Sequence, residues 1–168
     1  MLLSGHVFNW EWFNSLATLI PQEKCFPIYR KMQSQFWEEK IKKIRSRYGN
    51  EALEADDVMK HILRNPNDGN SAYMFVADQT PHISMVNFGI WFLNQKTPVF
   101  VGYDRLSSRM NVTFVYCEME KIKRGHYRVT YHEITPTNQK FEPYEVVKKF
   151  HKNLISPSYI GVVSIEIH

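Results

Sequence analysis

The hydrophobic positions of the chain form two kinds of pattern, short continuous runs and longer segments with one apolar face. Continuous runs of about four to eight apolar residues are typical of strands buried in a sheet. Apolar residues three and four positions apart, such as Trp37, Ile41 and Ile44, indicate helices that bury one face. These patterns predict strands within 1–6 and at 24–29, 72–77, 112–117 and 126–131, and helices at 9–20, 32–48, 56–64 and 142–154.

The segment between residues 79 and 110 has a weaker pattern. Residues 79–96 lack a clean period, so we expect a long loop there, and long loops often carry functional residues. Thr97 and Pro98 have the sequence of a helix start, a capping residue followed by proline at the first helical position. We therefore expect a helix from Thr97 to about Met110.

The order of these elements indicates the fold class. Strands and helices alternate up to residue 110, as in folds built on a parallel sheet. The last two strands flank Arg124 and Gly125, a turn sequence that predicts an antiparallel hairpin. The sequence therefore predicts a single-domain α/β sandwich around a mainly parallel sheet, with an antiparallel hairpin late in the chain.

Composition narrows the function classes only slightly. The formal charge of +4 and the pI near 9.0 fit either an ordinary solvated surface or attraction to lipid headgroups, an acidic carrier protein or nucleic acid. Cys25 and Cys117 both lie in apolar runs, which predicts buried free thiols and a reducing compartment. No apolar run approaches the roughly 18 residues that span a bilayer, and no His/Cys cluster has the spacing of a zinc site.

The first candidate for chemistry is His6, which is followed five positions later by Glu11. On one continuous helix the two side chains would point about 140° apart and would not meet. They can meet if His6 lies on the turn after a strand and Glu11 lies in the first helical turn after Asn9. A carboxylate on one imidazole nitrogen leaves the other nitrogen free as a base. The spacing alone favours the plainer interpretation, in which His6 is a turn histidine and Glu11 caps a helix.

Further motifs follow His6 in order. Tyr29 and Arg30 end the second strand, and Asp78 and Gln79 end a buried strand, where α/β sheets place ligand sites. This ordered set resembles the bacterial lipid A biosynthesis (late) acyltransferase family of the lysophospholipid acyltransferase-like superfamily. The resemblance covers about residues 3–158, and its motifs are Gly5-His-Val-Phe-Asn-Trp-Glu11, Tyr29-Arg30, Arg45 or Arg47 before Gly49, Phe75-Val-Ala-Asp-Gln79, Phe88-Gly89, Thr97-Pro98 with Gly102, and Gly125-His-Tyr127.

The resemblance implies a glycerol-3-phosphate acyltransferase-like fold and a reaction. A fatty acyl group would pass from an acyl carrier protein or coenzyme A thioester to a hydroxyl of a glycolipid such as a lipid A precursor. His6 would be the general base and Glu11 would orient it, with no covalent enzyme intermediate, no metal and no cofactor. The substrate-binding residues implied by the resemblance are Asn9, Tyr29, Arg30, Arg45, Asp78 and Gln79.

The resemblance also implies a place of action, the cytoplasmic face of the bacterial inner membrane. We expect residues 1–159 to form the catalytic core, and residues 160–168 to be an atypical end that departs from the family pattern. Family members carry a hydrophobic anchor before the histidine motif, and here only five residues precede it, so we expect the anchor to be missing. Trp91 and Phe92 are the preferred candidates for contact with the membrane.

Other functions stay open. The chain is alternatively an inactive, truncated lipid-binding remnant, or an acyltransferase for another acceptor such as a glycerophospholipid, an aminolipid or a phosphoinositol mannoside. The basic segment 40–47 suggests nucleic-acid binding, but glycine-rich and RNP-type aromatic signatures are missing. We therefore expect no nucleic-acid partner.

Overall fold

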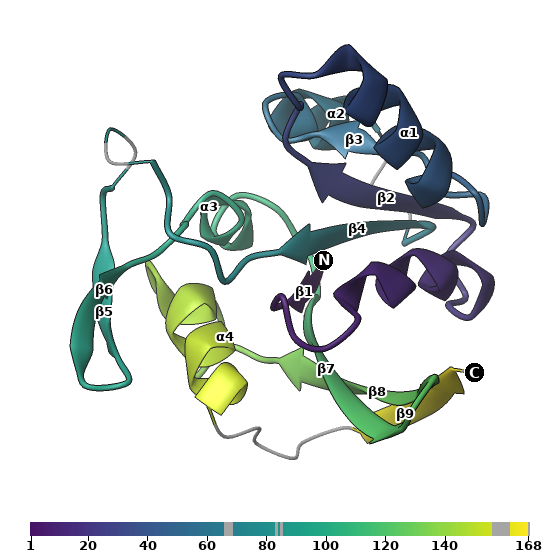
Figure 1. Ribbon diagram of the computed structural model, residues 1–168. Coiled ribbons are helices and arrows are strands. Elements are labelled where there is room, and N and C mark those ends of the chain that lie inside the picture. Colours follow the sequence, from purple (N-terminus) through teal and green to yellow (C-terminus); the bar gives the residue numbers. More distant parts are fainter. Residues whose placement is uncertain (66–68, 83, 85, 156–161, 168) are drawn as a thin grey trace. The chain divides into compact units, whose positions relative to one another are not determined.

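The protein forms two compact units, shown in the computed structural model of Figure 1. The structure describes residues 1–65, 69–82, 84, 86–155 and 162–167. Unit 1 consists of Met1–Phe8 and Val76–His168, and unit 2 consists of Asn9–Phe75.

Unit 2 is built on parallel strands. β2 pairs in parallel with both β3 and β4, with Cys25 opposite Ala72 in the second pair. The ring of Phe26 in β2 stacks on Tyr73 in β4, with 5.0 Å between centroids. The elements are η1 (Trp10–Thr18), β2 (Lys24–Tyr29), α1 (Gln35–Arg45), β3 (Leu53–Glu54), α2 (Val58–Arg64) and β4 (Ser71–Val76, whose last residue belongs to unit 1).

The helix expected after Asn9 has 3-10 geometry in η1. Side chains in it bond back to carbonyl groups three residues earlier, as in the bonds from Asn14 to the Glu11 carbonyl and from Ser15 to the Trp12 carbonyl, at 2.7 and 2.8 Å. Such bonds compete with the regular α-helical pattern, which explains the tighter turn. Glu11 lies in the first helical turn, as predicted.

Unit 1 combines one parallel strand pair with an antiparallel meander. β1 pairs in parallel with β7, β7 pairs with β8 as the predicted hairpin, and β9 adds antiparallel to β8. A separate hairpin is formed by β5 and β6. The elements are β1 (Leu2–Ser4), β5 (Gly89–Phe92), β6 (Gln95–Pro98), α3 (Asp104–Ser107), β7 (Phe114–Lys123), β8 (His126–Ile134), α4 (Glu145–Ile155) and β9 (Val162–Ile167).

The core of unit 1 lies against α4. Val146, Val147 and Phe150 are completely buried, and the ring of Phe150 contacts Tyr103 and Tyr116 edge to face. This burial of one helical face is what the apolar spacing over 142–154 predicted. The α/β class, mainly parallel pairing and the late antiparallel hairpin are confirmed.

Two expectations for residues 79–110 are wrong. Residues 89–98 form the β5–β6 hairpin, so Thr97 and Pro98 end a strand, and the helix that follows is only Asp104–Ser107. The hairpin turns at Leu93 and Asn94, which have φ of 48° and 64°. The turn lacks the glycine that marks most such hairpins, which is why the sequence did not indicate it.

The side of α1 that packs inward also differs from expectation. Helical spacing predicted that the apolar residues of 32–48 face the core. In the structure Phe36, Trp37 and Ile44 are more than half exposed, at 58%, 53% and 53%, whereas Glu38 is buried. A polar network holds this helix, and the apolar pattern by itself did not reveal it.

Candidate active site

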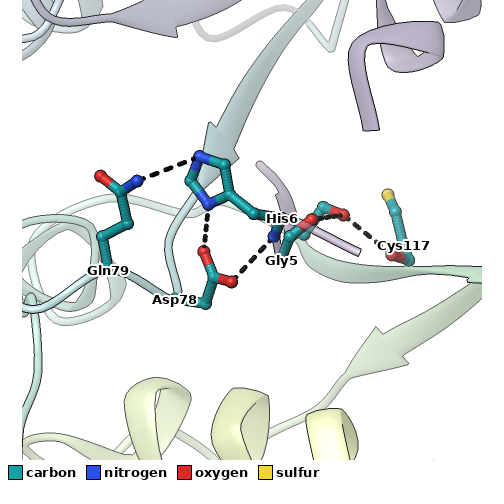
Figure 2. Close-up of polar contacts among 6 residues, drawn as sticks. Gly5, His6, Asp78, Gln79 and Cys117 are labelled. Atoms are coloured by element: carbon teal, nitrogen blue, oxygen red, sulfur yellow. Dashed lines mark hydrogen bonds and ion pairs between the residues drawn. The ribbon is translucent and has the colours of Figure 1, made fainter. Parts of the chain in front are cut away.

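The side chain of His6 is bound to the carboxylate of Asp78 (Figure 2). His6 Nδ1 lies 2.6 Å from Asp78 Oδ1, and the backbone N–H of His6 donates to Asp78 Oδ2 at 2.8 Å. Both carboxylate oxygens therefore fix the same residue, one through its ring and one through its backbone. This arrangement determines the orientation of the imidazole.

The strand ends around Ser4 and Ala77 bring the two residues together. The N–H of Ala77 donates to the Ser4 carbonyl at 2.8 Å, so His6 and Asp78 each follow a residue of this bonded pair. Gly5 permits the close approach, because a Cβ there would lie 3.2 Å from Asp78 Oδ2 and 3.1 Å from Leu154 Cδ2. The motif has glycine at position 5 because a side chain there would crowd the carboxylate of Asp78.

The hydrogen bonds assign a chemical role to each ring nitrogen of His6. An ionised carboxylate can only accept, so Nδ1 carries a proton and the neutral ring keeps its acceptor lone pair on Nε2. Gln79 Nε2 is 3.4 Å from His6 Nε2, a long contact that an incoming hydroxyl can replace. The side chains of His6 and Asp78 are 29% and 27% exposed, so the pair is open to solvent and to a substrate. A base with these properties can take a proton from a hydroxyl.

The segment after His6 is strained and apolar. Phe8 has a φ of 51°, a conformation that a bulky side chain rarely adopts, and such outliers gather at functional sites. Val7 and Phe8 are 39% and 58% exposed. The base is therefore followed directly by two exposed apolar side chains.

A second histidine, His151 of α4, was missed by the sequence reasoning. Burial lowers the pKa of His151, against the opposing effects of the Val147 carbonyl and the charge of Asp78. Its Nδ1 lies 2.9 Å from the Val147 carbonyl oxygen, and its ring meets Phe92 edge to face. The sequence could have indicated that His151 is buried, because it directly follows Phe150 on the apolar face of the predicted helix.

In unit 2, Glu11 forms an ion pair with Arg45. Arg45 Nη2 lies 2.7 Å from Glu11 Oε1, Arg45 Nε lies 3.4 Å from Oε2, and Asn14 donates to Oε2 at 2.8 Å. The guanidinium of Arg45 also lies over the ring of Trp10. These contacts join η1 to the end of α1 and compensate the charges of both residues.

The predicted pairing of His6 with Glu11 stays a prediction, because the two residues belong to different units. Asn9 occupies the N-cap position of η1, and its carbonyl accepts from the N–H of Trp12 at 2.9 Å. Arg30 is exposed after the end of β2. The substrate-binding roles of Asn9, Arg30 and Arg45 likewise stay predictions.

Tyr29, another predicted site residue, is buried in unit 2. Its hydroxyl donates to Glu38 Oε1 at 2.8 Å, and Lys42 Nζ lies 3.1 Å from the same oxygen. The N–H of Met32 donates to Glu38 Oε2 at 2.8 Å. Tyr29 therefore serves to hold α1, and its role in substrate binding stays a prediction.

The Glu38 network predicts a dependence of stability on pH. The Met32 N–H, helped by Tyr29 and Lys42 and opposed by burial, lowers the pKa of Glu38 to about 2. A carboxyl whose pKa is lower in the folded state stabilises the fold above its unfolded pKa, about 4.3, and loses this effect as pH falls through the folded value. We expect the urea concentration at the unfolding midpoint of the unmutated chain to decrease as the pH is lowered from about 5 to about 2. This decrease should be smaller in Glu38→Gln.

The matched control for this prediction is Glu39→Gln, at the exposed neighbour that pairs with Gln35. It should follow the pH dependence of the unmutated chain. Equal pH dependence in Glu38→Gln and Glu39→Gln would show that Glu38 does not stabilise the fold in this way.

Both cysteines of the chain lie in its described parts. Cys25 and Cys117 are buried free thiols, as expected, and burial raises the pKa of Cys25 to about 11. Among the described residues, no three His, Cys, Asp or Glu side chains are grouped to hold a metal ion. Among the same residues, no helix combines the length and the hydrophobicity that crossing a bilayer requires.

Comparisons with known proteins do not assign the chain to a family. No model of a known protein family matches it, and no curated protein matches it. The resemblance to late acyltransferases therefore rests on the ordered motifs of the sequence. The hydrogen bonds between His6 and Asp78 are a structural observation that does not depend on that resemblance.

Proposed function

We propose that the chain is an acyltransferase core in which His6 is the general base. The observation that supports this most is the 2.6 Å contact between His6 Nδ1 and Asp78 Oδ1. It orients the imidazole, leaves Nε2 to accept a proton, and stabilises the imidazolium that forms. In this proposal Asp78 takes the orienting role that the resemblance implied for Glu11.

The proposed reaction proceeds in two steps. His6 Nε2 removes the proton of an acceptor hydroxyl while the oxygen attacks the carbonyl carbon of an acyl thioester. The tetrahedral intermediate then collapses, the carbon–sulfur bond breaks, and the proton on Nε2 passes to the leaving thiolate. The products are an ester and a free thiol, and the enzyme returns to its starting state.

The negative oxygen of the intermediate needs a hydrogen-bond donor. Gln79 is suited to this, because its amide nitrogen already lies 3.4 Å from His6 Nε2. When a substrate hydroxyl takes the place beside Nε2, the amide is free to donate elsewhere. Arg30, Arg45 and the backbone near Asn9 remain candidate donors from the resemblance.

The proposed substrates come from the resemblance. The donor is a fatty acyl thioester of an acyl carrier protein or coenzyme A, and the acceptor is a membrane glycolipid such as a lipid A precursor. The exposed Val7 and Phe8 beside His6 are compatible with a substrate that carries acyl chains. The proposed place of action is the cytoplasmic face of the bacterial inner membrane, without metal or cofactor.

The test is an assay of the purified chain with an acyl thioester and a glycolipid in mixed micelles. Release of thiol and the mass of the acylated product are followed together. We expect thiol and ester to form in equal amounts, and only when the acceptor is present. Acceptors of the other lipid classes are run in parallel to identify the preferred hydroxyl.

The outcomes separate the alternatives. Thiol release without acceptor would indicate hydrolysis of the thioester and contradict acyl transfer. Binding of lipid with product at the level of a reaction without enzyme, for every acceptor, would favour the inactive lipid-binding remnant. Product formation that survives His6→Ala would contradict the role of His6.

A further inference from the structure

Helix α1 of unit 2 is attached through its charged side. The buried carboxylate of Glu38 receives hydrogen bonds from Tyr29 and Met32, and Arg45 is paired with Glu11. Lys42 Nζ completes this network at 3.1 Å from Glu38. The inner side of the helix is therefore occupied by ion pairs and hydrogen bonds.

Five other residues of α1 form one continuous outward face. With about 100° of rotation per residue, Lys43, Phe36, Lys40, Ile44 and Trp37 fall in this order within an arc of about 120°. Glu38, Arg45 and Lys42 fall on the opposite side of the helix. The helix thus exposes Phe36, Trp37 and Ile44 together with two lysines.

The outward face is rich in exposed aromatic surface. Phe36, Trp37 and Ile44 are 58%, 53% and 53% exposed, and the rings of Phe36 and Trp37 contact each other edge to face. Lys40 Nζ lies 4.9 Å from the centre of the Phe36 ring. Large apolar side chains that gather on a surface in this way mark an interaction site.

The charge on this face is positive. Lys40 and Lys43 lie among the apolar residues, and Arg47 follows the end of the helix as another exposed cation. Glu38 is turned inward, and Glu39 lies at the edge of the face, where it pairs with Gln35 at 3.1 Å. The expected occupant is therefore both negatively charged and apolar.

We propose that this face of α1 binds the surface of an anionic lipid bilayer. Trp and Phe rings are favourable at the boundary between headgroups and acyl chains, and lysine stems lie along apolar surface with the ammonium at the phosphates. Basic helices with exposed Trp, Phe or Leu bind in the plane of this interface. The composition and charge of the face favour this occupant over a second copy of the chain, which carries the same positive charge.

The inference concerns unit 2 alone and does not depend on the proposed reaction. Flotation of the full chain is measured with phosphatidylcholine vesicles, with and without phosphatidylglycerol, and without thioester or acceptor. We expect binding only to the anionic vesicles. Lys40→Glu with Lys43→Glu should lower the partition coefficient by at least about 25-fold, since each lysine contributes about fivefold near such a surface.

Matched controls test whether the loss of binding depends on the changes lying on the outward face of α1. Lys121→Glu with Lys123→Glu reverses two exposed charges on β7, and Leu63→Ser alters an exposed apolar residue of α2. These variants should keep most of the binding, whereas Phe36→Ser with Trp37→Ser should lose it. Circular dichroism verifies that every variant is folded, which is expected because all the changed side chains are exposed.

Three outcomes would overturn the proposal. The first is that the unmutated chain binds neither kind of vesicle. The second is that Lys121→Glu with Lys123→Glu loses as much vesicle binding as Lys40→Glu with Lys43→Glu. Sedimentation showing a dimer that dissociates in Phe36→Ser with Trp37→Ser would assign the face to a second copy of the chain. A chain that binds vesicles but transfers no acyl group would refute the proposed reaction and leave this surface intact.

Discussion

Replacing His6 by alanine should lower the rate of acyl transfer by about 100- to 10,000-fold, the usual contribution of a positioned base. Asp78→Asn keeps the shape of the side chain but removes the charge that orients and stabilises the imidazolium, so it should lower the rate by a comparable factor. The two residues act as one unit through the 2.6 Å contact. The double variant should therefore be hardly slower than His6→Ala.

This prediction is measured as kcat and kcat/KM with saturating thioester. The matched control is Asp57→Asn, an exposed aspartate whose side chain pairs only weakly with Lys60 at 3.4 Å, and it should keep the activity of the unmutated chain. If the loss from Asp78→Asn simply multiplies the loss from His6→Ala, the two residues act independently and the proposed pair is wrong.

The same measurement distinguishes Asp78 from Glu11 as the partner of His6. If Asp78 is the partner, Glu11→Gln acts through its pair with Arg45 in unit 2. Its effect on the rate should then multiply with that of His6→Ala. If Glu11 is the partner, the loss in Glu11→Gln should vanish in a background that already lacks His6. The kinetic cycle thus tests the motif-based assignment directly.

The second large effect is expected for stability. Phe150→Ala should lower the free energy of unfolding by about 3–5 kcal/mol, because the ring is completely buried and its removal leaves a cavity. The ring contacts Tyr103, Tyr116 and His151, so the loss spreads over α4, β7 and the segment before α3. This is a large fraction of the roughly 5–15 kcal/mol that stabilises a typical protein.

Urea unfolding followed by circular dichroism measures this change. Ile155→Ala on the same helix is the control, because Ile155 is 53% exposed and little apolar surface is uncovered when it is shortened. It should change the free energy by less than about 1 kcal/mol. Similar effects of the two substitutions would mean that α4 does not pack on the core of unit 1 as described.

Local patterns predicted the elements whose backbone geometry can be read from the spacing of their apolar residues. The run at 24–29 matches β2, the late hairpin matches β7 and β8, and the apolar spacing at 142–154 matches α4. These predictions succeeded because continuous apolar runs and helical spacing each fit one backbone geometry. The β5–β6 hairpin was missed because Leu93 and Asn94 adopt a left-handed turn without glycine, so Asn94 was the only weak turn signal at those two positions.

The sequence by itself determined that His6 follows a strand, that Glu11 lies in a first helical turn, and that Asp78 follows a buried strand. Only the tertiary structure decided that Asp78 binds the His6 ring and that Glu11 pairs with Arg45, across 72 and 34 positions of the chain. It also decided that α1 exposes Phe36 and Trp37 while burying Glu38. The reason is physical: periodicity reports which residues share a face, whereas the partners of charged groups are set by strands and helices that meet far apart in sequence.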